Sequence, residues 1–146
     1  MKGWGAVAIF AGGVFSGGVL SFAWARIPIW REMDVPRFLW DFDRTISKAD
    51  RVQPAFLVVT IVSSLLFAWS VDGVSRILAL AAAGGFGITL IASVAILVPL
   101  QRRMIKLGST AEEPIPQMRA RWFRGHLGRS VLSVVSFALL AAALTA

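Results

Sequence analysis

The sequence contains no cysteine, no tyrosine, no asparagine and a single histidine, His126. Without cysteine, the chain can form no disulfide, no thiolate nucleophile and no cysteine-ligated iron–sulfur cluster or haem. With one histidine, a multi-histidine metal site within one chain is also excluded. The residue types therefore disfavour metal sites and cofactors that are held by cysteine or by several histidines.

Acidic side chains are scarce as well. The chain has 8 Asp and Glu residues against 15 Lys and Arg residues, and its formal net charge is +7. None of the acidic residues falls inside a long apolar stretch. Small proton-coupled exporters depend on a carboxylate within the membrane, and carboxylate-bridged metal sites in helix bundles need several. Both functions are disfavoured.

Long apolar stretches dominate the rest of the chain. Hydrophobic residues make up 57% of the sequence, above the roughly 45–50% of soluble domains. Membrane spans are expected at about residues 4–25, 54–71, 74–100 and 120–145, with Pro99 ending the third. The uncharged part of the last stretch is short for a span, so its helix should begin earlier, around Pro116. These features predict an all-α integral membrane four-helix bundle, with residues 1–146 forming a single transmembrane domain.

The first basic loop contains an amphipathic pattern over about residues 35–50. Asp34 is a suitable N-cap, and Pro36 suits the first helical turn. Apolar side chains recur on one helical face, at Phe38, Phe42 and Ile46. We expect an amphipathic helix in this loop that lies on the membrane surface or caps the bundle.

The basic residues predict the orientation of the chain. Of the 15 Lys and Arg residues, all but Lys2 and Arg76 fall in residues 26–53 or 101–129. The positive-inside rule places both of these loops in the cytoplasm and both termini outside, in a multi-pass protein of the cell (inner) membrane. It also explains the net charge without nucleic acid as a partner.

A cluster of arginines, indole and imidazole precedes the last apolar stretch, in the sequence Arg119-Ala-Arg-Trp-Phe-Arg-Gly-His-Leu-Gly-Arg129. On a helix, Trp122, His126 and Arg129 share one face. One interpretation is an anchor at the membrane interface, where Trp and Arg meet the head groups. The other is a functional pocket, because ionisable groups at membrane depth are commonly functional.

In the pocket interpretation, His126 is the natural general base. Adjacent arginines favour its neutral form. A carboxylate of the first loop could orient the ring, and the candidates are Glu32, Asp34, Asp41, Asp43 and Asp50. We expect a cavity at the cytoplasmic end of the bundle, lined by Trp122, His126 and Arg129. Its rim would hold Arg26, Trp30 or Arg121, and its polar partners would come from Gln101 and residues 41–50.

The layout of four spans with Arg121-Trp122-x-x-x-His126-x-x-Arg129 at the start of the last one resembles the anthrone oxygenase-like family of small membrane proteins. The resemblance covers nearly the whole chain. It implies, from the fungal members, oxidation of an anthrone to an anthraquinone by oxygen, with no recognised metal or flavin. The family's Pro-x-Asn at the end of the third span is here Pro99-Leu100-Gln101, so Gln101 stands in place of the asparagine.

Residues and resemblance together predict a cofactor-independent oxygenase, or a binder, for a flat phenolic, anthrone-like or quinone-like aromatic. His126 would take the proton, and Arg121 and Arg129 would stabilise the enolate or reduced oxygen. The substrate-binding residues would be Trp122, Trp30, Arg26 and Gln101. The expected partners are the small aromatic substrate, dioxygen and membrane lipids, and a homo-oligomer is left open.

An alternative function is a non-catalytic membrane subunit. Its basic cytoplasmic loops would then bind lipid head groups or a protein partner. Oxygen uptake with an anthrone, and neighbouring genes for polyketide synthesis, would favour the oxygenase over this alternative.

The charge asymmetry makes a testable prediction about topology. A reporter fused after Gly108 should be cytoplasmic, and one fused at Ala146 should be external, because the basic loops stay on the cytoplasmic side. Paired fusions of alkaline phosphatase and green fluorescent protein measure both positions. A cytoplasmic C-terminus would contradict the four-span arrangement or its orientation.

Overall fold

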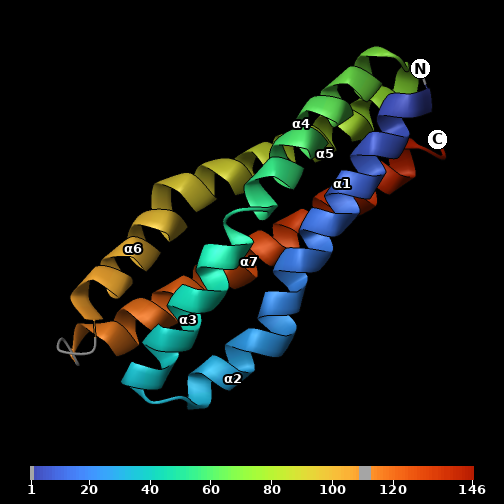
Figure 1. Ribbon diagram of the computed structural model, residues 1–146. Coiled ribbons are helices and arrows are strands. Elements are labelled where there is room, and N and C mark those ends of the chain that lie inside the picture. Colours follow the sequence, from blue (N-terminus) through green and yellow to red (C-terminus); the bar gives the residue numbers. More distant parts are fainter. Residues whose placement is uncertain (1, 109–112) are drawn as a thin grey trace.

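The computed structural model describes residues 2–108 and 113–146, and within these residues every regular element is helical. The elements are α1 (Lys2–Ser21), a π-helical turn η1 (Phe22–Arg26), α2 (Ile27–Glu32), α3 (Val35–Ala49), α4 (Gln53–Trp69), α5 (Gly73–Ala92), a second π-helical turn η2 (Ser93–Leu97), α6 (Val98–Leu107) and α7 (Pro114–Ala143). They form an elongated bundle (Figure 1). The predicted all-α four-helix bundle is confirmed.

Four segments are long and apolar enough to cross a membrane. They are Gly3–Glu32, Val35–Trp69, Gly73–Leu107 and Pro114–Ala143. The last has 30 residues, which as a helix extend about 45 Å, whereas the hydrocarbon core is about 30 Å thick. The chain is therefore a multi-pass membrane protein whose helices continue beyond the membrane. The two termini lie at the same end of the bundle (Figure 1).

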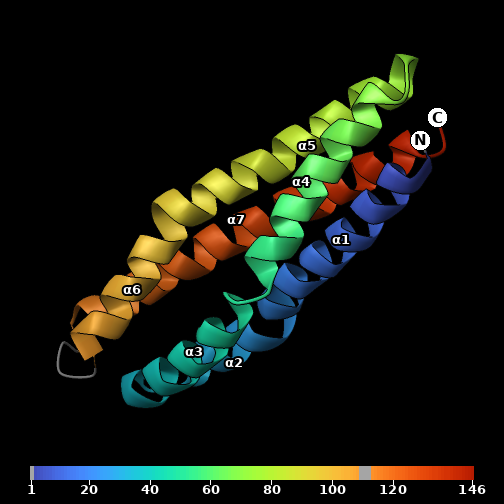
Figure 2. The ribbon, with the colours of Figure 1, turned by 45° about the horizontal axis from the view of Figure 1, so that its top comes forward.

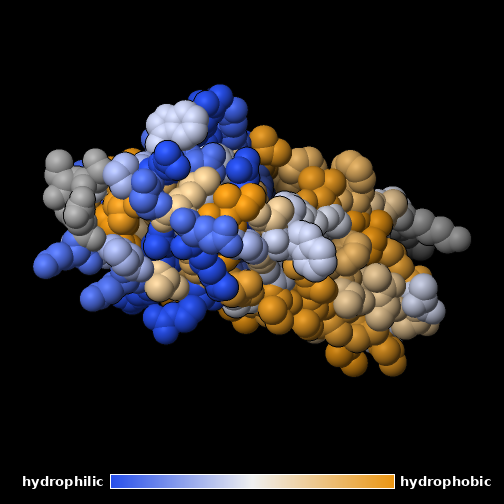
Figure 3. Space-filling model, turned by 90° about the horizontal axis from the view of Figure 1, so that it is seen from below, coloured by the Kyte–Doolittle hydropathy of each residue, from blue (hydrophilic) through white to orange (hydrophobic). Residues whose placement is uncertain are grey.

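The molecule has an apolar end and a polar end. The apolar end contains the termini, and its core is formed by side chains of α1, α4, α5 and α7. The polar end contains α2, α3, α6 and the first half of α7 (Figures 1 and 2). Hydrophilic residues gather at this end in the space-filling view, whereas hydrophobic residues cover the other (Figure 3). The polar end therefore projects from the membrane.

Two prolines lie inside long helices, directly after the π-helical turns. Pro28 follows η1 and Pro99 follows η2, each at the start of the next helical segment. The expectation that Pro99 ends the third helix is wrong, because the helix continues to Leu107. In each π-helical turn the closing N–H bonds a carbonyl five residues back, from Ile27 to Phe22 and from Val98 to Ser93. A proline is tolerated in the first turn of the next segment, where its missing N–H costs least.

The helix α3 begins where the sequence indicates. The Asp34 side chain accepts a hydrogen bond of 3.1 Å from the backbone N–H of Arg37. The buried residues of α3 are Phe38, Leu39, Phe42 and Ile46. They share one core with Trp30, Trp122 and Phe123. We call the rings of this core the aromatic cluster; it consists of Trp30, Phe38, Phe42, Trp122 and Phe123. Of the two expected placements, α3 therefore takes the one that caps the bundle.

The helix α7 begins at Pro114, before the apolar stretch that the sequence marks as a span. It thus carries Trp122, His126 and Arg129 along one continuous helix, as the short apolar stretch predicted. It packs closely on α5, where a Cβ added at Gly85 would overlap the Ser136 side chain. Glycine at this position lets the two helices approach.

The close approach of α5 and α7 gives a test by substitution. Gly85→Val should destabilise the bundle by about 1–3 kcal/mol, because the added atoms overlap Ser136 in a packed core. Gly84→Val is the matched control, since a Cβ at Gly84 meets nothing within 4 Å. The thermal midpoint of unfolding in detergent measures both. Equal shifts for the two variants would contradict the packing described here.

Candidate functional site

His126 lies inside the bundle, with its side chain 0% exposed. Its Nε2 is 2.9 Å from the backbone carbonyl oxygen of Val19 in α1. A carbonyl oxygen only accepts, so Nε2 donates and carries the proton. The enclosed Nδ1 has no hydrogen-bond partner among the described residues. In this neutral form of the ring, Nδ1 presents a lone pair that no neighbour uses.

The carboxylate expected to orient His126 is replaced by the Val19 carbonyl. Asp41 instead accepts hydrogen bonds from Trp30 Nε1 at 2.6 Å and Arg26 Nη1 at 3.4 Å. Asp50 accepts one from Gln101 Nε2 at 2.6 Å. The other candidates are accounted for elsewhere: Asp34 caps α3, Asp43 accepts from Ser47, and Glu32 is exposed. Asp41 therefore supports the aromatic cluster and Asp50 binds α6.

Aromatic rings enclose the imidazole. Trp122 stacks on it with ring centroids 4.9 Å apart, and Phe22 is tilted against it at 5.8 Å. Trp122 and Trp30 are both fully buried in the aromatic cluster. Neither indole has a free face on which a ligand could stack in this conformation. The expectation that they hold the substrate ring directly is therefore not met, and Trp122 instead supports His126.

Arg129 turns away from His126 toward η2. Its Nη1 donates a hydrogen bond of 3.1 Å to Ser93 Oγ, and its Nε has no partner among the described residues. It lines a hollow of about 70 Å³, which is enough for about two waters. The polar residues around this hollow are Asp50, Gln53, Ser93 and Arg129. The groups near Arg129 come from the first loop and the third span, and Asp50 among them accepts the hydrogen bond of Gln101.

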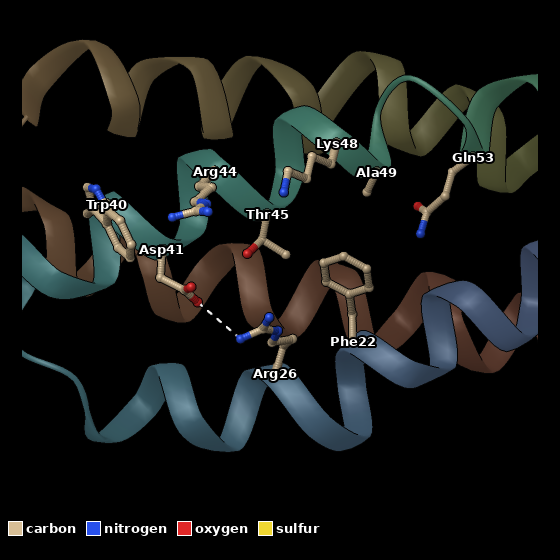
Figure 4. A pocket seen from close by; sticks show the side chains of 9 residues that line it. All are labelled: Phe22, Arg26, Trp40, Asp41, Arg44, Thr45, Lys48, Ala49 and Gln53. Atoms are coloured by element: carbon tan, nitrogen blue, oxygen red, sulfur yellow. Dashed lines mark hydrogen bonds and ion pairs between the residues drawn. The ribbon is translucent and has the colours of Figure 1, made fainter.

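A larger groove of about 620 Å³ lies between η1 and α3 (Figure 4). It is lined by Phe22, Arg26, Trp40, Asp41, Arg44, Thr45, Lys48, Ala49 and Gln53. Three of these residues are cationic and one is acidic, so the groove carries an excess of positive charge. The Arg44 guanidinium lies 5.2 Å from the centre of the Trp40 ring. Arg26 thus lines a groove other than the cavity expected around His126, and Trp30 does not line it.

The single cavity expected around Trp122, His126 and Arg129 is divided in the structure. Trp122 and His126 line none of the hollows described within residues 2–108 and 113–146. Arg121 is exposed and faces a different hollow, together with Pro99 and Arg103. Arg121 and His126 are separated by about 1.4 helical turns, and this rotation places Arg121 on the outside of α7.

Two side chains connect the groove with His126 and with the small hollow beside Arg129. Phe22 lines the groove and also touches the His126 ring. Gln53 lines both the groove and the small hollow beside Arg129. Phe22 and Ser93 were not expected at the site, whereas Arg44 and Lys48 fall within residues 41–50, which were expected to supply polar partners. Phe22 could have been found from its spacing, since it lies one helical turn before Arg26.

Comparison with protein families supports the membrane and oxygenase predictions. A family model described as anthrone oxygenase matches residues 42–139, which is more than half of the chain. The matched range contains Gln101, His126 and Arg129. No curated protein and no solved structure matches the chain. Within the described residues, no group of three His, Cys, Asp or Glu side chains could hold a metal ion.

The bonds of Asp41 give a prediction about the aromatic cluster. Asp41→Ala should lower the unfolding free energy by about 1–3 kcal/mol, because it removes the acceptor of the buried Trp30 indole. Asp41→Asn should cost less, since the amide oxygen can still accept that bond. Asp43→Ala, on the exposed side of the same helix, is the control. Thermal midpoints in detergent rank the variants, and a harmless Asp41→Ala would contradict this role.

Proposed function

The chain belongs to the anthrone oxygenase family, and we propose that it is a membrane-embedded oxygenase that oxidises a flat phenolic ring system without a bound cofactor. One observation carries the proposal within the molecule. It is the buried His126 ring, whose Nε2 is held by Val19 and whose Nδ1 has no partner. A base oriented by a second group in this way is the arrangement that proton abstraction requires.

The first step is removal of a proton from carbon. An anthrone-like substrate has a CH₂ group that is acidic because the resulting anion is delocalised over the rings. His126 Nδ1 takes this proton and leaves an electron-rich enolate. The stacked Trp122 and the Val19 bond keep the imidazole in one orientation while it does so. Positioning of this kind lowers the barrier by removing orientational freedom before reaction.

The second step is oxidation of the enolate by dioxygen. The carbon loses two hydrogens and gains one oxygen atom of O₂ as a carbonyl. The other oxygen atom leaves as water with the two hydrogens. All the electrons that reduce dioxygen come from the substrate, so the reaction balances without an outside reductant. The protein needs only to bind the ring, accept a proton and stabilise anions.

Arg129 and Arg26 are the cations suited to stabilise these anions. Arg129 has an unpartnered Nε beside the small hollow, where reduced oxygen could be held. Arg26 lies in the groove, where an enolate oxygen could approach it. The sequence also suggested Arg121 as an anion-stabilising cation, but Arg121 faces another hollow and has no part in the proposed mechanism. Gln101 acts indirectly, because its side-chain amide donates a hydrogen bond that positions Asp50.

Oxygen uptake by purified protein with an anthrone tests the function. His126→Gln should lower the rate about 100- to 10,000-fold, because the amide can still donate to the Val19 carbonyl but cannot take a proton. Arg124→Gln, exposed on the same helix, should keep the wild-type rate. Thermal midpoints show whether each variant is folded. A folded His126→Gln variant with full oxygen uptake would contradict the assignment of the base.

The alternative function, a non-catalytic membrane subunit, is favoured by the exposed cations of the polar end. Arg31, Arg37, Arg102, Arg103 and Arg124 are all exposed and could bind anionic head groups. The oxygen-uptake experiment separates the two functions. Wild-type protein that consumes no oxygen with any anthrone tested would favour the subunit.

A further inference from the structure

We propose that the groove between η1 and α3 is the substrate-binding site, that it takes a planar aromatic as its phenolate, and that Phe22 is the movable wall between this groove and His126. The inference rests on the proposed function, because the ligand class comes from it. The groove, its charge and its shared wall are properties of the described residues. Figure 4 shows the Phe22 ring standing beside Arg26 and directed toward α3.

The size of the groove suits a fused-ring ligand. Its volume of about 620 Å³ lies within the range of roughly 300–1,000 Å³ that holds small molecules. Its aromatic walls are Phe22 on one side and Trp40 on the other. Trp40 is 65% exposed, although it belongs to a helix whose other large apolar residues are mostly buried. An exposed indole beside a groove offers a flat surface for stacking.

The charges of the groove favour an anionic ligand. Arg26 is paired with Asp41, and Arg44 lies over Trp40. The side-chain ammonium of Lys48 has neither a hydrogen bond nor an ion pair among the described residues, and the side chain lines the groove. The groove thus holds one cation without a partner and a second that contacts only an aromatic face. A phenolate oxygen would satisfy Lys48 or Arg44 while the rings contact Trp40.

Phe22 is placed to control access from the groove to the base. It lines the groove, and its ring centroid is 5.8 Å from that of His126 and 6.0 Å from that of Trp30. It begins η1, a widened turn in which no residue is buried. Turns of this kind are often found at functional sites, and a segment with few buried contacts opens at low cost. Displacement of the Phe22 ring would bring His126 into contact with a ligand in the groove.

Chemical modification tests the wall directly. His126 is the only histidine, so the imidazole adduct of diethyl pyrocarbonate reports on this ring alone. Wild-type protein should react slowly, since the ring is 0% exposed. Phe22→Ala should react several-fold faster, and Phe22→Leu should fall between the two. Phe56→Ala is the control, because Phe56 is a half-buried ring at the apolar end.

Two outcomes of this experiment decide the role of Phe22. Faster modification in both Phe22 variants, at unchanged thermal midpoints, supports the wall. If one variant is unstable, the other decides. Equal modification rates in the wild type and in a folded Phe22 variant would show that Phe22 does not shield His126, and would overturn its role as the wall.

Ligand binding tests the groove. Dihydroxyanthraquinone, a planar phenol of the product class, serves as the probe in detergent, and its own absorbance reports binding. Lys48→Gln should weaken binding about tenfold, which corresponds to the loss of one charge-assisted contact. Trp40→Ala should weaken it as well. Arg37→Gln, exposed on α3 and outside the groove, should bind as the wild type does.

The binding and uptake experiments together separate the two proposals. Weaker binding in the groove variants supports the site, even if no oxygen is consumed, and in that case only the oxygenase fails. If Lys48→Gln and Trp40→Ala both keep wild-type oxygen uptake, wild-type probe binding and wild-type KM, the groove is not the substrate-binding site. The proposed oxygenase function would be unaffected by that result. Displacement of the probe by vesicles of phosphatidylglycerol, but not of phosphatidylcholine, would show a lipid-phosphate site and also overturn the proposal.

Discussion

The arrangement of the polar end depends on the pairing of α1 and α7 through buried polar groups. His126 Nε2 donates to the Val19 carbonyl. The Ser130 hydroxyl donates to the His126 carbonyl of its own helix at 2.8 Å and lies 3.3 Å from the same Val19 oxygen. Closer to the apolar end, Ser16 Oγ donates to the carbonyl of Ser133 at 3.1 Å. Where water is absent, a polar group without a partner costs free energy, so these bonds fix the rotation and register of α7 against α1. Trp122, Arg129 and the aromatic cluster take their places from that register.

The two π-helical turns, η1 and η2, bring side chains of the first and third long helices to the part of α7 that contains His126 and Arg129. Each turn interrupts a long helix and is followed by a proline, and each contacts α7. The first, η1, brings Phe22 to His126, and the second, η2, brings Ser93 to Arg129. Leu97 of η2 also packs on Gly125, where an added Cβ would lie 2.7 Å from its Cδ2 atom. A straight helix at either place would direct these side chains elsewhere, because each inserted residue rotates the next part of the helix.

The sequence was sufficient for features that depend on local pattern. The capped start and buried face of α3 follow from Asp34 and the spacing of Phe38 and Phe42. The early start of α7 follows from the length that a span requires. Contacts between distant segments could not be predicted in this way. A backbone carbonyl of α1 carries no side-chain signature, so a carboxylate was the expected partner of His126, and Val19 was not considered.

The position of Arg121 shows the same limit. A helical wheel places it next to the face that carries Trp122 and Arg129, but the rotation of α7 is set by α1 and α5, which turn Arg121 outward. Pro99 was expected to end a helix because the π-helical turn before it is not visible in the residue types. Helix existence and amphipathic faces are thus encoded locally. The composition of the site is decided by packing between helices.

The separation of base, cations and groove has a consequence for how such a small protein could control oxidation. An enolate exposed to water and oxygen would react without direction. Here the imidazole is enclosed by Trp122 and Phe22, and the cations of the groove line the other side of Phe22. Proton removal in this arrangement would require a ligand that displaces Phe22 and meets the positive charge of the groove. In the proposed mechanism, the aromatic wall would couple ring recognition to exposure of the base, and the shape of the substrate would be a condition for reaction.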